Sequence, residues 1–187
     1  MVTYQRLIGL YSPAPQSGKS TVAGILERDY GFRRRPFAAA LKRMTETFLQ
    51  SLGVSPERIA HYSEAGKLEP IPEAKGATYR KIAQTMGTDW GRAVIDRDIW
   101  LAPVINDYEI NGGLVVVEDV RFENEYNAIL DAGGEMWKIV RPGATVPNGH
   151  PSEGRLDGYI MDAVIVNDRG VEDLKSSVAM FLGVRQQ

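Results

Sequence analysis

Short apolar segments alternate with longer amphipathic segments along the whole chain. Five short segments indicate strands, at residues 6–11, 32–37, 114–118, 136–140 and 163–166. Segments with apolar residues three or four positions apart indicate helices, at residues 19–30, 38–52, 79–86, 99–108, 123–132 and 171–182. The run from Leu114 to Val117 is apolar on both faces, as in a parallel strand covered by helices on both sides. This alternation predicts an α/β fold with a mainly parallel sheet flanked by helices.

Two segments rich in Pro and Gly interrupt this pattern. Residues 54–78 predict an exposed insertion with one short helix near 56–62, and residues 141–162 predict a lid-like loop. We expect both to belong to one domain that covers residues 1–187.

Two expectations concern the helical segments. In the helix at 38–52, one face carries most of the large apolar residues and is expected to be buried: Leu41, Met44, Phe48 and Leu52. The glycine-containing segment 87–92 is expected to form turns.

The pentapeptide Ser17-Gly18-Lys19-Ser20-Thr21 joins the first predicted strand to the first predicted helix. A strand, a tight loop, Gly-Lys-Ser and a helix make up the layout of a phosphate-binding loop. The first N–H groups of a helix lack partners and carry partial positive charge, so they can bind a nucleotide phosphate. Lys19 would neutralise the β- and γ-phosphates, and Ser20 would offer its hydroxyl to Mg²⁺.

Prolines replace part of the usual loop pattern. Pro13 stands where the pattern G-x-x-x-x-G-K-S/T has its first glycine, and Pro15 follows. Since proline has no N–H and a fixed φ, the rim of the loop should be stiffer and poorer by one or two donors.

Asp119 is predicted at the carboxyl end of the strand at 114–118, which is the edge where parallel sheets bind ligands. The phosphate-binding loop and the segment after Val140 should lie at the same edge. Asp119 is therefore placed like a carboxylate that helps to hold Mg²⁺. The alternative, which does not exclude the first, is that it caps the helix that follows Phe122.

Several cations and aromatic rings could contact a nucleotide. Five arginines lie in or beside loops and helix starts, and two of them are expected to be surface charges only: Arg80, Arg92, Arg97, Arg121 and Arg141. Trp90 and Trp100 could stack on a base or could be core or rim aromatics. Neither His61 nor His150 has a partner at metal-ligand spacing.

Composition mainly excludes classes of protein. The 187 residues, 43% of them hydrophobic, suit one globular domain with a sizeable core. The net charge of −2 gives no basic field for nucleic acid, and the absence of cysteine excludes disulfides and thiolate chemistry. No apolar run approaches the ~20 residues that span a bilayer, and the first residues lack signal-peptide form. We therefore expect a cytoplasmic protein, in the host cell if it is viral.

Short motifs in a set order resemble the deoxynucleoside monophosphate kinases of bacteriophages, relatives of the adenylate-kinase-like P-loop kinases. Besides the phosphate-binding loop and Arg80, the motifs are FAAALK at 37–42, QTMGTD at 84–89, DRDIW at 96–100, EDVRFENE at 118–125, VRPG at 140–143, HPSE at 150–153 and VND at 166–168. They span nearly the whole chain, and they are specific only as a set.

This resemblance implies a reaction in which ATP and a deoxynucleoside monophosphate give ADP and the diphosphate. It implies a P-loop fold with a monophosphate-binding insertion, Mg²⁺ held by Ser20 and Asp119, and catalytic roles for Lys19, Asp119 and Arg121. The ATP site would take Ser17, Gly18, Lys19, Ser20, Thr21, Arg141 at the start of the lid-like loop, and Asn167 near the donor base. The acceptor site would take Lys42, Arg80, Gly87, Thr88, Arg92, Trp100, Asp119, Arg121 and Glu125.

Two alternatives stay open. The proline-rich loop favours a nucleotide-binding or interaction module without turnover, and another small acceptor, such as dephospho-coenzyme A, is compatible with a kinase. A GTPase is disfavoured because Asn167-Asp168 lacks the lysine of a guanine-reading motif. A homodimer also stays open, whereas nucleic acid and membranes are not expected as partners.

Overall fold

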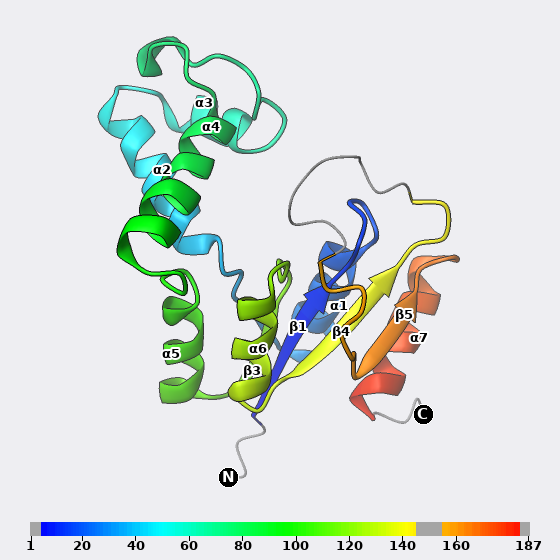
Figure 1. Ribbon diagram of the computed structural model, residues 1–187. Coiled ribbons are helices and arrows are strands. Elements are labelled where there is room, and N and C mark those ends of the chain that lie inside the picture. Colours follow the sequence, from blue (N-terminus) through cyan, green and yellow to red (C-terminus); the bar gives the residue numbers. More distant parts are fainter. Residues whose placement is uncertain (1–4, 145–154, 184–187) are drawn as a thin grey trace. The chain divides into compact units, whose positions relative to one another are not determined.

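The computed structural model describes residues 5–144 and 155–183. The chain forms two compact units, of which unit 1 comprises Met1–Phe37 and Val104–Gln187, and unit 2 comprises Ala38–Pro103 (Figure 1). The segment 54–78, expected as an insertion, lies inside unit 2. That residues 1–187 act as one domain stays a prediction.

The described part of unit 1 contains a five-stranded sheet, as the sequence predicts. Its strands are β1 (Arg6–Tyr11), β2 (Arg33–Arg34), β3 (Leu114–Val117), β4 (Glu135–Val140) and β5 (Ala163–Val166), in the order β2-β3-β1-β4-β5. All four pairings are parallel, and Ile8 of β1 lies opposite Val116 on one side and Glu135 on the other. The carboxyl ends of the strands therefore share one edge of the sheet, which confirms the expected parallel architecture.

Helices cover both faces of this sheet. The core of one face is formed by Ile8, Leu10, Val116, Trp137, Ile139 and Ile165 of the sheet with residues of α1 (Lys19–Tyr30) and α7 (Val171–Leu182). The helix α6 (Glu123–Asp131) packs on β1 and β4 from the opposite side (Figure 1). Gly31 ends α1 and Gly183 ends α7, both at a φ of 73°, the left-handed conformation that glycine adopts without strain.

Two elements differ from the expected bounds. The strand expected at 32–37 is reduced to β2, which consists of the first two residues of the basic triplet Arg33-Arg34-Arg35. The helix expected from Ile99 is α5 (Ala102–Asn111), which begins three residues later. The residues before α5 form turns instead, and in them the Asp96 carboxylate accepts a hydrogen bond of 2.7 Å from the Asp98 N–H.

Unit 2 has its own small core. Its elements are α2 (Ala39–Ser51), α3 (Pro56–Ser63), the 3₁₀ turn η1 (Pro72–Ala74), α4 (Tyr79–Gln84) and the π-helix η2 (Thr85–Ile95). The core consists of Leu49, Val54, Ile59, Tyr62, Ile71 and Tyr79. Because four of these six lie within 54–78, the expectation that this segment is exposed is wrong for those four residues, although Leu68 is 67% exposed. Its surface is tied by an ion pair between Arg58 and Glu73.

The expectation of turns at 87–92 is also wrong, since η2 continues the helical path of α4. The glycines there permit close packing. A Cβ on Gly87 would lie 2.7 Å from Leu41 Cδ2, and a Cβ on Gly91 would lie 2.5 Å from the Trp100 ring. Both glycines are needed because neighbouring side chains occupy the space of a Cβ.

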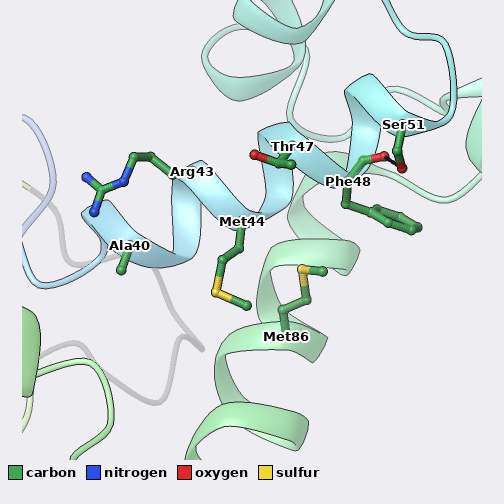
Figure 2. A pocket seen from close by; sticks show the side chains of 7 residues that line it. All are labelled: Ala40, Arg43, Met44, Thr47, Phe48, Ser51 and Met86. Atoms are coloured by element: carbon green, nitrogen blue, oxygen red, sulfur yellow. Dashed lines mark hydrogen bonds between the residues drawn. The ribbon is translucent and has the colours of Figure 1, made fainter.

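The buried face of α2 is only partly the predicted one. Leu41 and Leu52 are half-buried, and Leu52 packs against the core of unit 2, but the expectation is wrong for the other two residues. Met44 and Phe48 are 37% and 40% exposed, whereas Thr45 and Leu49 are fully buried. Thr45 can be buried because its hydroxyl donates a hydrogen bond of 3.0 Å to the Leu41 carbonyl oxygen. Figure 2 shows the side chains of Met44 and Phe48 beside that of Met86, where they line an open groove.

This shift of the buried face predicts different losses of stability for two truncations in one helix. Leu49→Ala should lower the free energy of unfolding by about 2–5 kcal/mol, because it leaves a cavity in a closed core. Met44→Ala should lower it by less than about 1 kcal/mol, because the side chain is partly in water. Urea unfolding followed by circular dichroism measures both, and a larger loss in Met44→Ala than in Leu49→Ala would contradict the observed packing.

Candidate functional site

Four loops of unit 1 leave the sheet at its carboxyl edge. The segment 12–18 follows β1, Glu118 and Asp119 follow β3, Arg141 follows β4, and Asn167 follows β5. The structure thus brings the loop residues, Asp119 and the segment after Val140 to one edge, as the sequence predicts.

The loop after β1 has the backbone expected of an anion-binding turn. Gln16 and Gly18 have φ values of 55° and 105°, both in the left-handed region. Gly18 precedes α1 without a side-chain cap, and its carbonyl accepts the first helical hydrogen bond, of 2.9 Å, from the Val22 N–H. The first turn of α1 therefore begins with backbone donors that no capping side chain takes up. Among the residues of that turn, Lys19 is half-buried, and Ser20 and Thr21 are exposed.

One buried hydroxyl in this loop has no partner in the described residues. Ser17 is 1% exposed, and its Oγ makes no hydrogen bond there. A buried hydroxyl without a hydrogen-bond partner lowers the stability of the folded state unless a ligand or a water molecule forms the missing bond. The residue types and the geometry fit a bound phosphate chain.

The rim of the loop is held by its own side chains and by the two neighbouring strand ends. The Ala14 N–H donates a hydrogen bond of 3.3 Å to Ser12 Oγ, and both residues are buried. The Arg141 guanidinium donates a hydrogen bond of 3.2 Å to the Gln16 carbonyl oxygen. The Asn167 amide donates one of 2.8 Å to the Ser17 carbonyl oxygen.

Asp119 lies three residues before Phe122, which is the N-cap residue of α6. Its carboxylate Oδ1 accepts a hydrogen bond of 2.8 Å from the Phe37 N–H, which comes from the segment after β2. Asp119 is half-buried. This bond orients the Asp119 carboxylate at the edge of the sheet. Because Phe37 and Asp119 are 82 positions apart in the chain, no local sequence pattern could have predicted it.

Glu125 caps the start of α6. It is 3% exposed, and its Oε2 accepts hydrogen bonds from the N–H groups of Arg121, at 2.7 Å, and Phe122, at 3.1 Å. A carboxylate at this position of the first turn also interacts favourably with the helix dipole. Glu125 thus holds the backbone that carries the exposed side chain of Arg121.

The basic triplet after α1 is paired with acidic residues of unit 1. Arg33 and Arg35 form ion pairs with Asp107, and Arg34 forms one with Glu118. These arginines therefore form ion pairs within the fold.

A contact around Asp157 has no counterpart in the sequence motifs. The Tyr11 hydroxyl and the Lys138 ammonium donate hydrogen bonds of 3.1 Å and 2.7 Å to Asp157 Oδ1. Burial, and then the neighbouring Asp157 charge, raises the pKa of Tyr11, so its hydroxyl stays protonated as a donor. The end of β1 is thereby tied to the chain that enters β5. His150 lies outside the described residues, as do residues 145–154 of the expected lid-like loop.

Unit 2 holds the other predicted acceptor residues. Trp100 is 5% exposed, and its indole Nε1 donates a hydrogen bond of 2.9 Å to the Gly87 carbonyl oxygen. This brings two predicted residues together and makes Trp100 a core aromatic, whereas Trp90 is 44% exposed. The remaining residues differ in exposure: Arg92 is half-buried, and Lys42, Arg80, Thr88 and Arg97 are exposed.

Comparison with known proteins identifies the family. A model of the family described as deoxynucleotide monophosphate kinase matches residues 57–178, which is more than half of the chain. A protein of Acanthamoeba polyphaga mimivirus assigned to these kinases is 33% identical over 188 residues, covering 92% of this chain and 93% of the viral protein. The chain belongs to the deoxynucleotide monophosphate kinase family.

Other relatives of the family match less of their own length. The deoxynucleotide monophosphate kinase of Enterobacteria phage T4 is 32% identical over 109 residues, which cover 56% of this chain and 45% of the phage protein. Among solved structures, a dephospho-CoA kinase from Campylobacter jejuni matches 95% of this chain and 96% of its own, with a TM-score of 0.50 and 15% identity. At that identity the likeness concerns the fold alone, and it confirms the P-loop kinase architecture. None of the helices within 5–144 and 155–183 is long and apolar enough to cross a membrane.

Proposed function

We propose that this member of the family transfers the γ-phosphate of ATP to a deoxynucleoside monophosphate, giving ADP and the deoxynucleoside diphosphate. The observation that carries the proposal is the loop between β1 and α1. It combines an uncapped helix start at Gly18, the buried Ser17 hydroxyl that no described group satisfies, and Lys19 in the first helical turn.

Ser17, Gly18, Lys19, Ser20 and Thr21 would hold the phosphates of ATP in this proposal. Backbone N–H groups at the start of α1 would bind the phosphate oxygens, and the Lys19 ammonium would balance the charge between the β- and γ-phosphates. Arg141, bonded to the loop at Gln16, would add a guanidinium at the rim.

Ser20 and Asp119 are the residues that would hold Mg²⁺. The Ser20 hydroxyl is exposed and the half-buried Asp119 carboxylate lies at the same edge of the sheet, and both offer the hard oxygen atoms that Mg²⁺ prefers. When bound, the metal supplies charge neutralisation for the transferred phosphoryl group.

In unit 1, Arg121 would bind the acceptor phosphate. In unit 2, the family resemblance implies the same role for Lys42, Arg80 and Arg92. The Arg121 side chain is exposed on a backbone that Glu125 holds, which suits a guanidinium that grips a small ligand. Gly87, Thr88, Trp100, Asp119 and Glu125 complete the proposed acceptor set. Positioning and charge neutralisation would supply most of the catalysis, so no general base is required.

The family assignment makes the two alternatives less favoured. Both alternatives, a binding module without turnover and a kinase for another small acceptor, would differ from the activity by which the family is described. A location in the cytoplasm, which would be that of the host cell if the protein is viral, fits a reaction between ATP and a deoxynucleoside monophosphate. The oligomeric state and the absence of nucleic acid as a partner stay predictions.

A coupled assay of ADP release tests the proposal. With ATP and Mg²⁺, at least one of dAMP, dGMP, dCMP, dTMP or hydroxymethylated dCMP should be phosphorylated. Lys19→Ala should lower the rate at least about 100-fold, because it removes a charge aimed at the transferred group, while the folded structure is retained. Protein that binds ATP but phosphorylates none of the five would favour the binding module, and full turnover by folded Lys19→Ala would overturn the loop assignment.

Arg121→Ala separates the acceptor site from the donor site. We expect the KM for the monophosphate to rise about 10- to 100-fold, because a charge-assisted contact to its phosphate is lost, with a smaller change in the KM for ATP. The matched control is Arg169→Ala, which removes an exposed guanidinium elsewhere in unit 1 and should change neither constant. An equal rise in both constants for Arg121→Ala would count against an acceptor role.

A further inference from the structure

Asn167 contacts the backbone of the phosphate-binding loop from the end of β5. Its side-chain Nδ2 donates a hydrogen bond of 2.8 Å to the carbonyl oxygen of Ser17. Its own backbone N–H donates a hydrogen bond of 2.7 Å to the Val140 carbonyl oxygen. The amide that reaches the loop is therefore attached to a backbone that the sheet already holds.

The same amide occupies the space next to Gly18. A Cβ built on Gly18 would lie 2.5 Å from Asn167 Nδ2, and the φ of 105° at Gly18 disfavours any other residue. Asn167 and Gly18 thus fit each other, and the close approach brings the amide donor onto the peptide that joins Ser17 to Gly18.

Holding one end of a peptide group fixes the direction of the other end. A trans peptide is planar, and its C=O and N–H point in opposite directions. Because Asn167 holds the Ser17 carbonyl oxygen, the Gly18 N–H must point away from Asn167. Without that bond the peptide could flip and present a carbonyl oxygen where the N–H had been, and a carbonyl oxygen repels a phosphate.

The preceding peptide is held in the same way. Arg141 donates to the Gln16 carbonyl oxygen at 3.2 Å, so the Ser17 N–H is directed away from Arg141. Two successive carbonyl oxygens are held from the ends of β4 and β5. Successive N–H groups that share a direction form the concave backbone arrangement that binds anions.

We propose that Asn167 is a positioning residue that latches the Ser17–Gly18 peptide so that the Gly18 N–H is available to the triphosphate. The inference rests on the proposed function, and it gives Asn167 a role different from the contact with the donor base that the family resemblance implies. A latch acts on the phosphate chain, whatever base is attached, whereas a base contact acts only on the base.

Binding of ATP and of inorganic tripolyphosphate, each with Mg²⁺, distinguishes the two roles. Asn167→Leu keeps the approximate size of the side chain and removes the donor, and Asn167→Ala is the second variant in case the first misfolds. We expect both ligands to bind about 10-fold more weakly to either variant, by isothermal titration. The KM for the monophosphate and the thermal midpoint should stay at the wild-type values, which a general loss of structure would not allow.

The neighbouring Asp168→Ala variant is the matched control. It alters an exposed residue one position away that makes no bond to the loop among the described contacts, and it should bind both ligands as the wild type does. The proposal is overturned if Asn167→Leu and Asn167→Ala weaken ATP but not tripolyphosphate, since that pattern marks a base contact. It is also overturned if neither ligand is weakened. A wild-type protein that binds neither ATP nor tripolyphosphate would overturn the proposed function itself.

Discussion

The parallel pairing of β1 with β3 and β4 is the constraint on which the rest of unit 1 depends. Since all strands run the same way, every loop after a strand leaves from one edge, and the polar residues of four loops meet there. The packing of α1 and α7 on the same face of the sheet then fixes where α1 begins. Burial of apolar side chains thus determines the position of the backbone donors at Gly18 and beyond.

The loop after β1 is stiffened from several sides. Pro13 and Pro15 restrict its backbone, Ser12 caps its first turn, and Arg141 and Asn167 hold two successive carbonyl oxygens. A loop held in this way needs less ordering when a ligand binds, which favours affinity. The prolines therefore remove N–H donors from the rim while side chains from two other strand ends orient the donors that remain.

Local patterns in the sequence predicted the helices and strands correctly where a single apolar periodicity or a single helix cap determined the structure. The bounds of β1, α1 and α7 were predictable from apolar spacing, and Gly31 and Gly183 mark the ends of the two helices. The buried face of α2 was only partly predictable, because Thr45 and Leu49 are buried in place of Met44 and Phe48, and this choice depends on how the helix packs within unit 2. Likewise, Gly87 and Gly91 predict turns by composition but serve close packing. The Asp119 contact with Phe37, like the Asn167 contact with Ser17, joins distant segments and needs the fold to be seen.

The most direct test of this account is the response of the backbone amides to Mg²⁺ and ATP, measured by ¹⁵N nuclear magnetic resonance. The account predicts that the largest chemical-shift changes fall on the amides of residues 17–21, because their N–H groups become hydrogen-bonded to phosphate oxygens. Large changes confined to other parts of the chain, with the amides of residues 17–21 unmoved, would contradict the claim that the start of α1 is the triphosphate site.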